Sequence, residues 1–111
     1  MSNVYLIKLS NENESFYKIG VTVHKYCRFY EIMKSGYSVE IIYMAMKLDF
    51  YDAYGLESYL QGIYESYRPK IKFGGYTECF KHINIENYKE KLNSFLKQNY
   101  SYIENLKITW R

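Results

Sequence analysis

Hydrophobic and polar positions follow a strand-like pattern through the first twenty residues of the chain. Residues 4–9 (VYLIKL) are rich in β-branched and aromatic side chains, and residues 16–22 (FYKIGVT) resume this pattern after the polar segment SNENES. Two such runs joined by turn-forming residues predict a β-hairpin with a rather long loop. Within the second run, Lys18 is a single basic residue among apolar neighbours. It either faces water or lies beside a substrate that carries negative charge.

The pattern then changes to a helical period. Tyr26, Phe29 and Met33 recur at helical spacing in a predicted helix over residues 23–34, which the Ser-Gly pair at 35–36 ends. Residues 38–47 (SVEIIYMAMK) are expected to form a third strand.

A second and longer helix is expected to begin at Asp49 and to end before Pro69, because the residue that precedes a proline disfavours the helical conformation. Gly55 and Gly62 lie within it, and each costs about 1 kcal/mol relative to alanine. The segment KFGGYTECFKHI predicts a Gly-Gly loop and another short strand, and residues 86–98 predict a third helix.

This order of elements predicts an α+β domain. We expect an N-terminal β-hairpin plus one or two further strands in a mixed sheet, flanked by three helices. The 111 residues are enough to bury a core without disulfide or metal crosslinks. We therefore expect a single domain over residues 1–111, with a C-terminal helix and tail over residues 83–111.

Composition narrows the class of protein only slightly. Fifteen Lys and Arg residues face 12 acidic residues, a net charge of +3, which is compatible with a polyanionic partner but does not require one. Cys27 and Cys79 form no CxxC pair, so we expect reduced core thiols, neither a zinc site nor a disulfide. The N-terminus has no signal-like pattern and no apolar run is long enough to cross a bilayer. We therefore expect a soluble, cytoplasmic protein with no membrane partner.

Glu57 is the most informative single residue of the second helix. At 100° per residue it falls about 40° from Ala53, inside the apolar stripe that also contains Leu56 and Leu60. An unpaired buried carboxylate costs several kcal/mol. Glu57 therefore reaches solvent at the edge of the stripe, pairs with an arginine, or binds a metal ion. Arg28 lies off the apolar stripe of the first helix, on one face with His24, so packing does not explain its position. It is either a solvated arginine or a partner of Glu57.

The hairpin, the arginine and the glutamate together resemble the GIY-YIG nuclease superfamily. Its Gly-Ile-Tyr motif is similar to Asn3-Val4-Tyr5, which lacks the glycine, and its Tyr-Ile-Gly motif is similar to Lys18-Ile19-Gly20, where lysine replaces tyrosine. This YKIG variant and the later sequence GYTECF (residues 75–80) most resemble the branch named after a phage T5 open reading frame, often described as a DNA-binding domain. The resemblance covers residues 3–82.

The resemblance implies metal-assisted hydrolysis of phosphodiester bonds in DNA, by nicking or double-strand cleavage. Tyr5 would act as general base or position the attacking water, and Glu57 would bind one divalent ion, Mg²⁺ or Mn²⁺. Arg28 would stabilise charge on the phosphate. Lys18 would replace the second tyrosine and favour the phenolate form of Tyr5.

Side-chain parity along the strand places Lys18 with Gly20, while Tyr17 points to the opposite face of the sheet. Further accessory candidates are Tyr17 itself, His24, Tyr30 and Glu78.

The expected partner is DNA, and sequence specificity would be loose, come from a homodimer or be supplied by another protein. If the chain is phage-encoded, it would act in the host cytoplasm. The alternative function is a DNA-binding module of the same fold with weak or no cleavage. In either case four basic residues are candidates for phosphate contacts, although such residues are often simply solvated: Lys70, Lys72, Lys81 and His82.

Overall fold

The structure is a computed structural model that describes residues 2–24, 26–96 and 101–108. It confirms the α+β class. The elements are β1 (Ser2–Ser10), β2 (Ser15–Thr22), α1 (Cys27–Lys34), β3 (Ser38–Leu48), α2 (Phe50–Gln61), β4 (Cys79–Phe80), α3 (Ile85–Leu96) and β5 (Ser101–Ile108).

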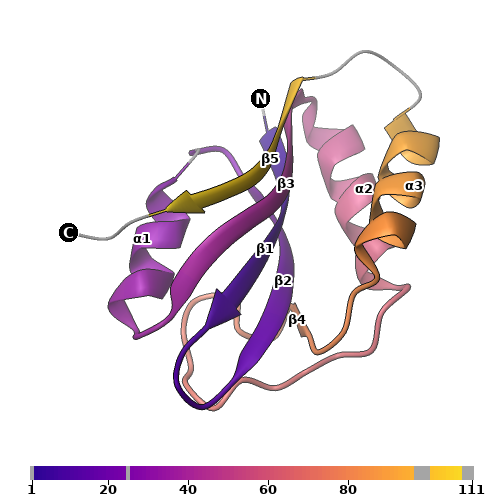
Figure 1. Cartoon of the computed structure of the whole chain (residues 1–111). Coiled ribbons are helices and arrows are strands. Elements are labelled where there is room, and N and C mark those ends of the chain that lie inside the picture. The colour runs from indigo at the N-terminus through magenta and orange to yellow at the C-terminus, as the bar shows by residue number, and fades with distance from the viewer. Residues whose placement is uncertain (1, 25, 97–100, 109–111) are drawn as a thin grey trace.

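The strands form one five-stranded sheet in the order β4-β2-β1-β3-β5. Helix α1 covers one face of this sheet, and α2 and α3 cover the other (Figure 1). Strands β1 and β2 form the predicted hairpin, and Tyr5 lies opposite Gly20 across it. No helix in the described ranges is long and apolar enough to span a bilayer.

Each face of the sheet has its own hydrophobic core. The α1 face buries Tyr5, Phe16 and Phe29 with the remainder of one cluster. The α2 and α3 face buries a second cluster that includes Leu56 and Leu60. Side chains alternate along β2, so Phe16, Lys18 and Gly20 all lie on the α1 face, next to the first core.

The sheet differs from the predicted one in two respects. The four strand pairings are all antiparallel, so the expectation of a mixed sheet was wrong. Three strands, not one or two, join the hairpin, because residues 101–108 form β5 along β3. The sequence predicted only a tail for that segment.

The helix boundaries also need correction. The first helix begins at Cys27, not at Val23, with Tyr26 at its N-terminal boundary. The second ends at Gln61 with Gly62 as its C-cap, well before Pro69. The third spans Ile85–Leu96, and residues 97–98 of the predicted range lie outside the described part. Cys79 is buried as expected, whereas Cys27 is exposed.

The chain after α2 is anchored to the hairpin loop by the carboxylate of Glu14. Glu14 is 8% exposed. It accepts hydrogen bonds from the hydroxyls of Tyr37 and Tyr67, both at 2.5 Å, and from the backbone N–H of Lys70 at 3.1 Å. The bonds from Tyr67 and Lys70 hold the segment between α2 and β4 against the β1–β2 hairpin. Figure 1 shows this segment passing below the hairpin.

Candidate active site

Tyr5 and Lys18 meet on the α1 face of the sheet. Lys18 Nζ donates a hydrogen bond to Tyr5 Oη at 2.8 Å, and both side chains are 0% exposed. The ring of Tyr5 packs edge-on against Phe29 of α1, with 5.0 Å between centroids. An ammonium group only donates hydrogen bonds, so Tyr5 Oη is the acceptor. The sequence allows Lys18 either to face water or to lie beside a charged substrate. Its buried contact with a phenol excludes the position in water.

Two glycines make room for this pair. A Cβ atom added at Gly20 would lie 2.6 Å from Tyr5 Cζ and 3.0 Å from Lys18 Nζ. A Cβ atom at Gly75 would lie 2.8 Å from Lys18 Cε, and Gly75 also has a φ of +83°, which side-chain-bearing residues rarely adopt. The glycine of the KIG motif and the second glycine of the Gly-Gly loop thus enclose the lysine from two sides.

Glu78 is the acidic partner of Lys18. Its Oε1 lies 3.2 Å from Lys18 Nζ, and its side chain is 37% exposed. Burial alone would lower the pKa of Lys18, but the attraction and hydrogen bond of Tyr5, followed by those of Glu78, outweigh it and leave the pKa raised. Lys18 is therefore held as an ammonium ion at neutral pH. The accessory candidate Glu78 does lie at the predicted site.

Glu57 approaches the same cluster from α2, around the open edge of β2. Strand β4 pairs only with Tyr17 and Lys18. Beyond them, Gln61 Nε2 donates to the carbonyl of Ile19 at 2.9 Å, and Glu57 accepts from the backbone N–H of Val21. Glu57 is 9% exposed, as its place on the apolar stripe predicts.

The surroundings of Glu57 make its ionised form less favourable than in water. Burial and then the nearby Glu78 raise its pKa, while Lys18 and the Val21 N–H lower it by less. No arginine forms an ion pair with Glu57 among the described residues, so the pairing interpretation has no support there. A raised pKa is typical of a carboxylate short of positive charge.

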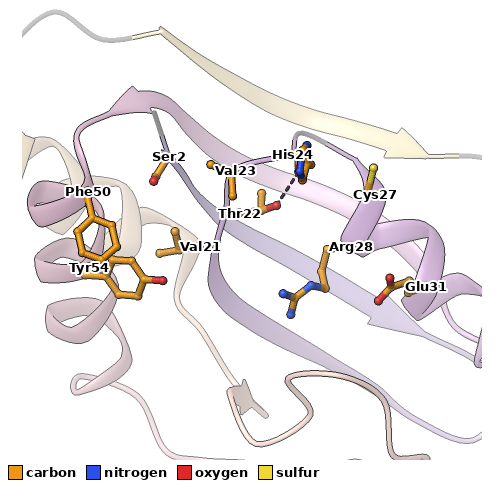
Figure 2. A pocket seen from close by; sticks show the side chains of 10 residues that line it. All are labelled: Ser2, Val21, Thr22, Val23, His24, Cys27, Arg28, Glu31, Phe50 and Tyr54. Carbon is orange, nitrogen blue, oxygen red and sulfur yellow. Dashed lines mark hydrogen bonds between the residues drawn. The ribbon is translucent and has the colours of Figure 1, made fainter.

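Arg28 lies on a cavity beside this cluster. The cavity has a volume of about 540 Å³ and opens between α1 and the start of α2. Figure 2 shows the guanidinium of Arg28 extending from α1 over the sheet, with Val21 in the cavity floor and Phe50 on the opposite wall. Val21 connects this cavity to the active-site cluster, because its N–H binds Glu57.

The other predicted site residues are dispersed. Tyr17 points to the α2 face and packs against the second core, which confirms its predicted orientation and separates it from Lys18. His24 is exposed and lines the cavity. Tyr30 is 37% exposed on α1.

The four basic candidates for DNA contacts lie on the segment after α2 and around β4. Lys70, Lys72, Lys81 and His82 are all exposed. Lys81 Nζ donates to the carbonyl of Ser15 and lies 5.0 Å from the ring centroid of Tyr67. All four remain accessible to a phosphate backbone.

The sequence did not indicate the roles of two residues of the site, Gln61 and Gly75, or of the anchoring carboxylate Glu14. Gln61 binds the β2 edge and also donates to Glu78 Oε2 at 3.4 Å. Gly75 fits against Lys18, and the Gly-Gly pair was the available signal for a close backbone approach. Glu14 was treated as part of a polar loop, and no local pattern indicated that two distant tyrosines would bind it.

The described residues include no group of three or more His, Cys, Asp or Glu side chains arranged to hold a metal ion. Glu57 is the carboxylate that the resemblance assigns to a divalent ion. Mg²⁺ is commonly bound through one or two carboxylates, with water and substrate phosphates completing its shell. The carboxylate of Glu57, whose pKa burial and the nearby Glu78 raise, fits such a site.

Comparisons of the chain with protein-family models, curated proteins and solved structures found no match. The resemblance to GIY-YIG nucleases therefore stays a prediction.

Proposed function

We propose that the protein hydrolyses phosphodiester bonds in DNA with the help of one divalent metal ion, as an endonuclease. The hydrogen bond from Lys18 to Tyr5 carries this proposal. The ammonium group of Lys18 thus places a buried positive charge against the hydroxyl that would remove a proton from, or position, the attacking water.

The residues divide the chemistry between them. Tyr5 Oη has Lys18 as its one hydrogen-bond partner in the described part of the chain, so a lone pair of the oxygen remains to accept a hydrogen bond or a proton from an attacking water once water reaches it. Arg28, with its planar set of donors, would bind the phosphate as charge develops on its oxygens. Glu57 would hold the ion, which when bound neutralises the phosphate and stabilises the leaving oxygen.

A DNA-binding module without cleavage is the second candidate. One observation favours it: Tyr5 and Lys18 are both fully buried, and Gly75 covers Lys18. Catalysis by this pair requires the segment around Gly75 to shift, whereas binding through the exposed lysines does not.

Plasmid cleavage separates these two functions. Supercoiled plasmid is incubated with the protein in Mg²⁺ or Mn²⁺, beside Tyr5→Phe and Glu57→Gln. Loss of a general base typically costs about 100-fold or more in rate, so Tyr5→Phe should nick far more slowly. Glu57→Gln should do so too, because it loses the proposed metal ligand. Tyr59→Phe and Glu65→Gln, which alter exposed side chains outside the site, are matched controls that should nick normally.

Three results are decisive. Metal-dependent nicking that is lost in both site variants supports the nuclease. Plasmid that is retarded in a gel but uncut in every divalent metal supports the binding module. Equal nicking by wild type and Tyr5→Phe would exclude the proposed role of Tyr5.

A further inference from the structure

The cavity between α1 and α2 has two chemically different walls. Its floor is the end of β2 around Val21 and Thr22, and its volume of about 540 Å³ lies within the range of about 300–1,000 Å³ usual for small-ligand sites. Figure 2 shows polar side chains on the α1 wall and two aromatic rings on the α2 wall.

The α2 wall exposes aromatic rings that packing does not explain. Phe50 is 59% exposed and Tyr54 is 47% exposed, with their ring centroids 4.6 Å apart. Tyr51, which contacts Phe50, is 84% exposed. Leu56 and Leu60 already supply the core-facing side of this helix. The aromatic wall is therefore available to a ligand with a flat face.

The α1 wall supplies charge and hydrogen-bonding groups. Arg28 and His24 can contact a phosphate, and the carboxylate of Glu31 can accept hydrogen bonds from the amino group of a base. The aromatic rings and the cationic groups thus border one cavity from either side of the end of β2 (Figure 2). This combination matches the two parts of a nucleotide, because bases stack on aromatic rings and phosphates bind arginine.

The base that fits here must be unpaired. In a duplex the faces of each base are covered by its neighbours and only the edges are accessible in the grooves, so a ring can stack only on a base that has left the helix or lies in a single strand. We propose that this cavity binds an unpaired nucleotide of DNA beside the phosphate to be cut, and that DNA with a bulge or gap is the preferred substrate. This rests on the proposed nuclease function for the cutting step only.

Binding can be measured without cleavage. Two duplexes that differ only in one 2-aminopurine, either paired or placed as a single-base bulge, are titrated with wild-type protein in EDTA. We expect about tenfold tighter binding of the bulged duplex, from one stacked base, and quenching of its 2-aminopurine fluorescence. Tyr54→Leu should lose about tenfold in affinity for the bulge, while Tyr54→Phe should keep it.

Tyr59→Leu is the matched control. Tyr59 is a 41% exposed tyrosine on the same helix that stacks on Phe95 and does not line the cavity, so it should bind the bulge like wild type. Equal affinity for the two duplexes, or unchanged bulge binding by Tyr54→Leu, would overturn the proposal. If the protein nicks plasmid but binds both duplexes equally, the nuclease function stands and the proposed nucleotide site is excluded. If it prefers the bulged duplex but nicks plasmid in no metal, the nucleotide site stands and the nuclease function is excluded.

Discussion

The close approach of Gly20 to the Tyr5 ring predicts that Gly20→Ala destabilises the fold. The new Cβ would lie 2.6 Å from Tyr5 Cζ. The ring cannot move aside easily, because Tyr5 is 0% exposed and packs against Phe29. Overpacking of a core typically costs about 1–3 kcal/mol.

That cost translates into measurable shifts. With an m value of about 2 kcal/mol/M, the urea midpoint should fall by about 0.5–1.5 M, and Tm should fall by about 4–12 °C. Gly55→Ala is the matched control, because its Cβ would lie 3.5 Å from Phe95, an ordinary contact, in the interior of α2. It should be neutral or stabilise by up to about 1 kcal/mol.

A double-mutant cycle tests the cause. Tyr5→Phe removes the hydroxyl, which is the Tyr5 atom nearest to the new methyl group of Gly20→Ala, but keeps Cζ. The clash is therefore relieved in part, and the two substitutions should cost less together than the sum of their separate effects. Urea unfolding followed by circular dichroism gives all four free energies. An unchanged midpoint for Gly20→Ala, or strict additivity with Tyr5→Phe, would refute the packing argument.

Three further predictions concern charge and backbone. Burial opposes ionisation of Glu14, but its bonds from two tyrosines and Lys70 outweigh this and lower its pKa. Its contribution to stability is therefore present above the ordinary pKa near 4.5 and is lost as the pH falls through the lowered value; Glu14→Gln should flatten urea midpoints measured between pH 7 and pH 3, and an unchanged pH dependence would contradict this. The raised pKa of Glu57 means that its ionisation opposes folding at neutral pH. Ca²⁺ should therefore raise the Tm of wild type but not of Glu57→Gln, and an equal rise in both would exclude Glu57 as the ligand. Gly75→Ala, at a φ of +83° and against Lys18, should lower the urea midpoint, whereas Gly74→Ala, which meets nothing within 4 Å, should not.

Local patterns predicted the features that depend on a single element. The period of two in β2 placed Lys18 opposite to Tyr17, and the helical period of α2 placed Glu57 on its buried stripe. Both orientations follow from backbone geometry alone, so they hold without knowledge of the tertiary contacts.

Features that depend on distant partners could not be predicted. The second helix ends at Gln61, although its pattern continues almost to Pro69. Tyr67 instead donates its hydroxyl to Glu14 and its N–H to the carbonyl of Cys79. The pairing of β5 with β3 likewise depends on an edge that only the folded sheet presents. Lys18 and Glu78 are separated by sixty residues, so no local pattern could show their contact.

The short β4 strand leaves the β2 edge without a strand partner from Gly20 onward, and Glu57 and Gln61 bind that edge instead. An exposed strand edge is a template for pairing with a second chain, and an inward-pointing charge is one way in which proteins block it. The carboxylate proposed to bind the metal ion thus also occupies part of the strand edge with which a second chain would pair. A Glu57→Ala variant removes both properties at once, whereas Glu57→Gln keeps an acceptor for Val21 and isolates the loss of charge.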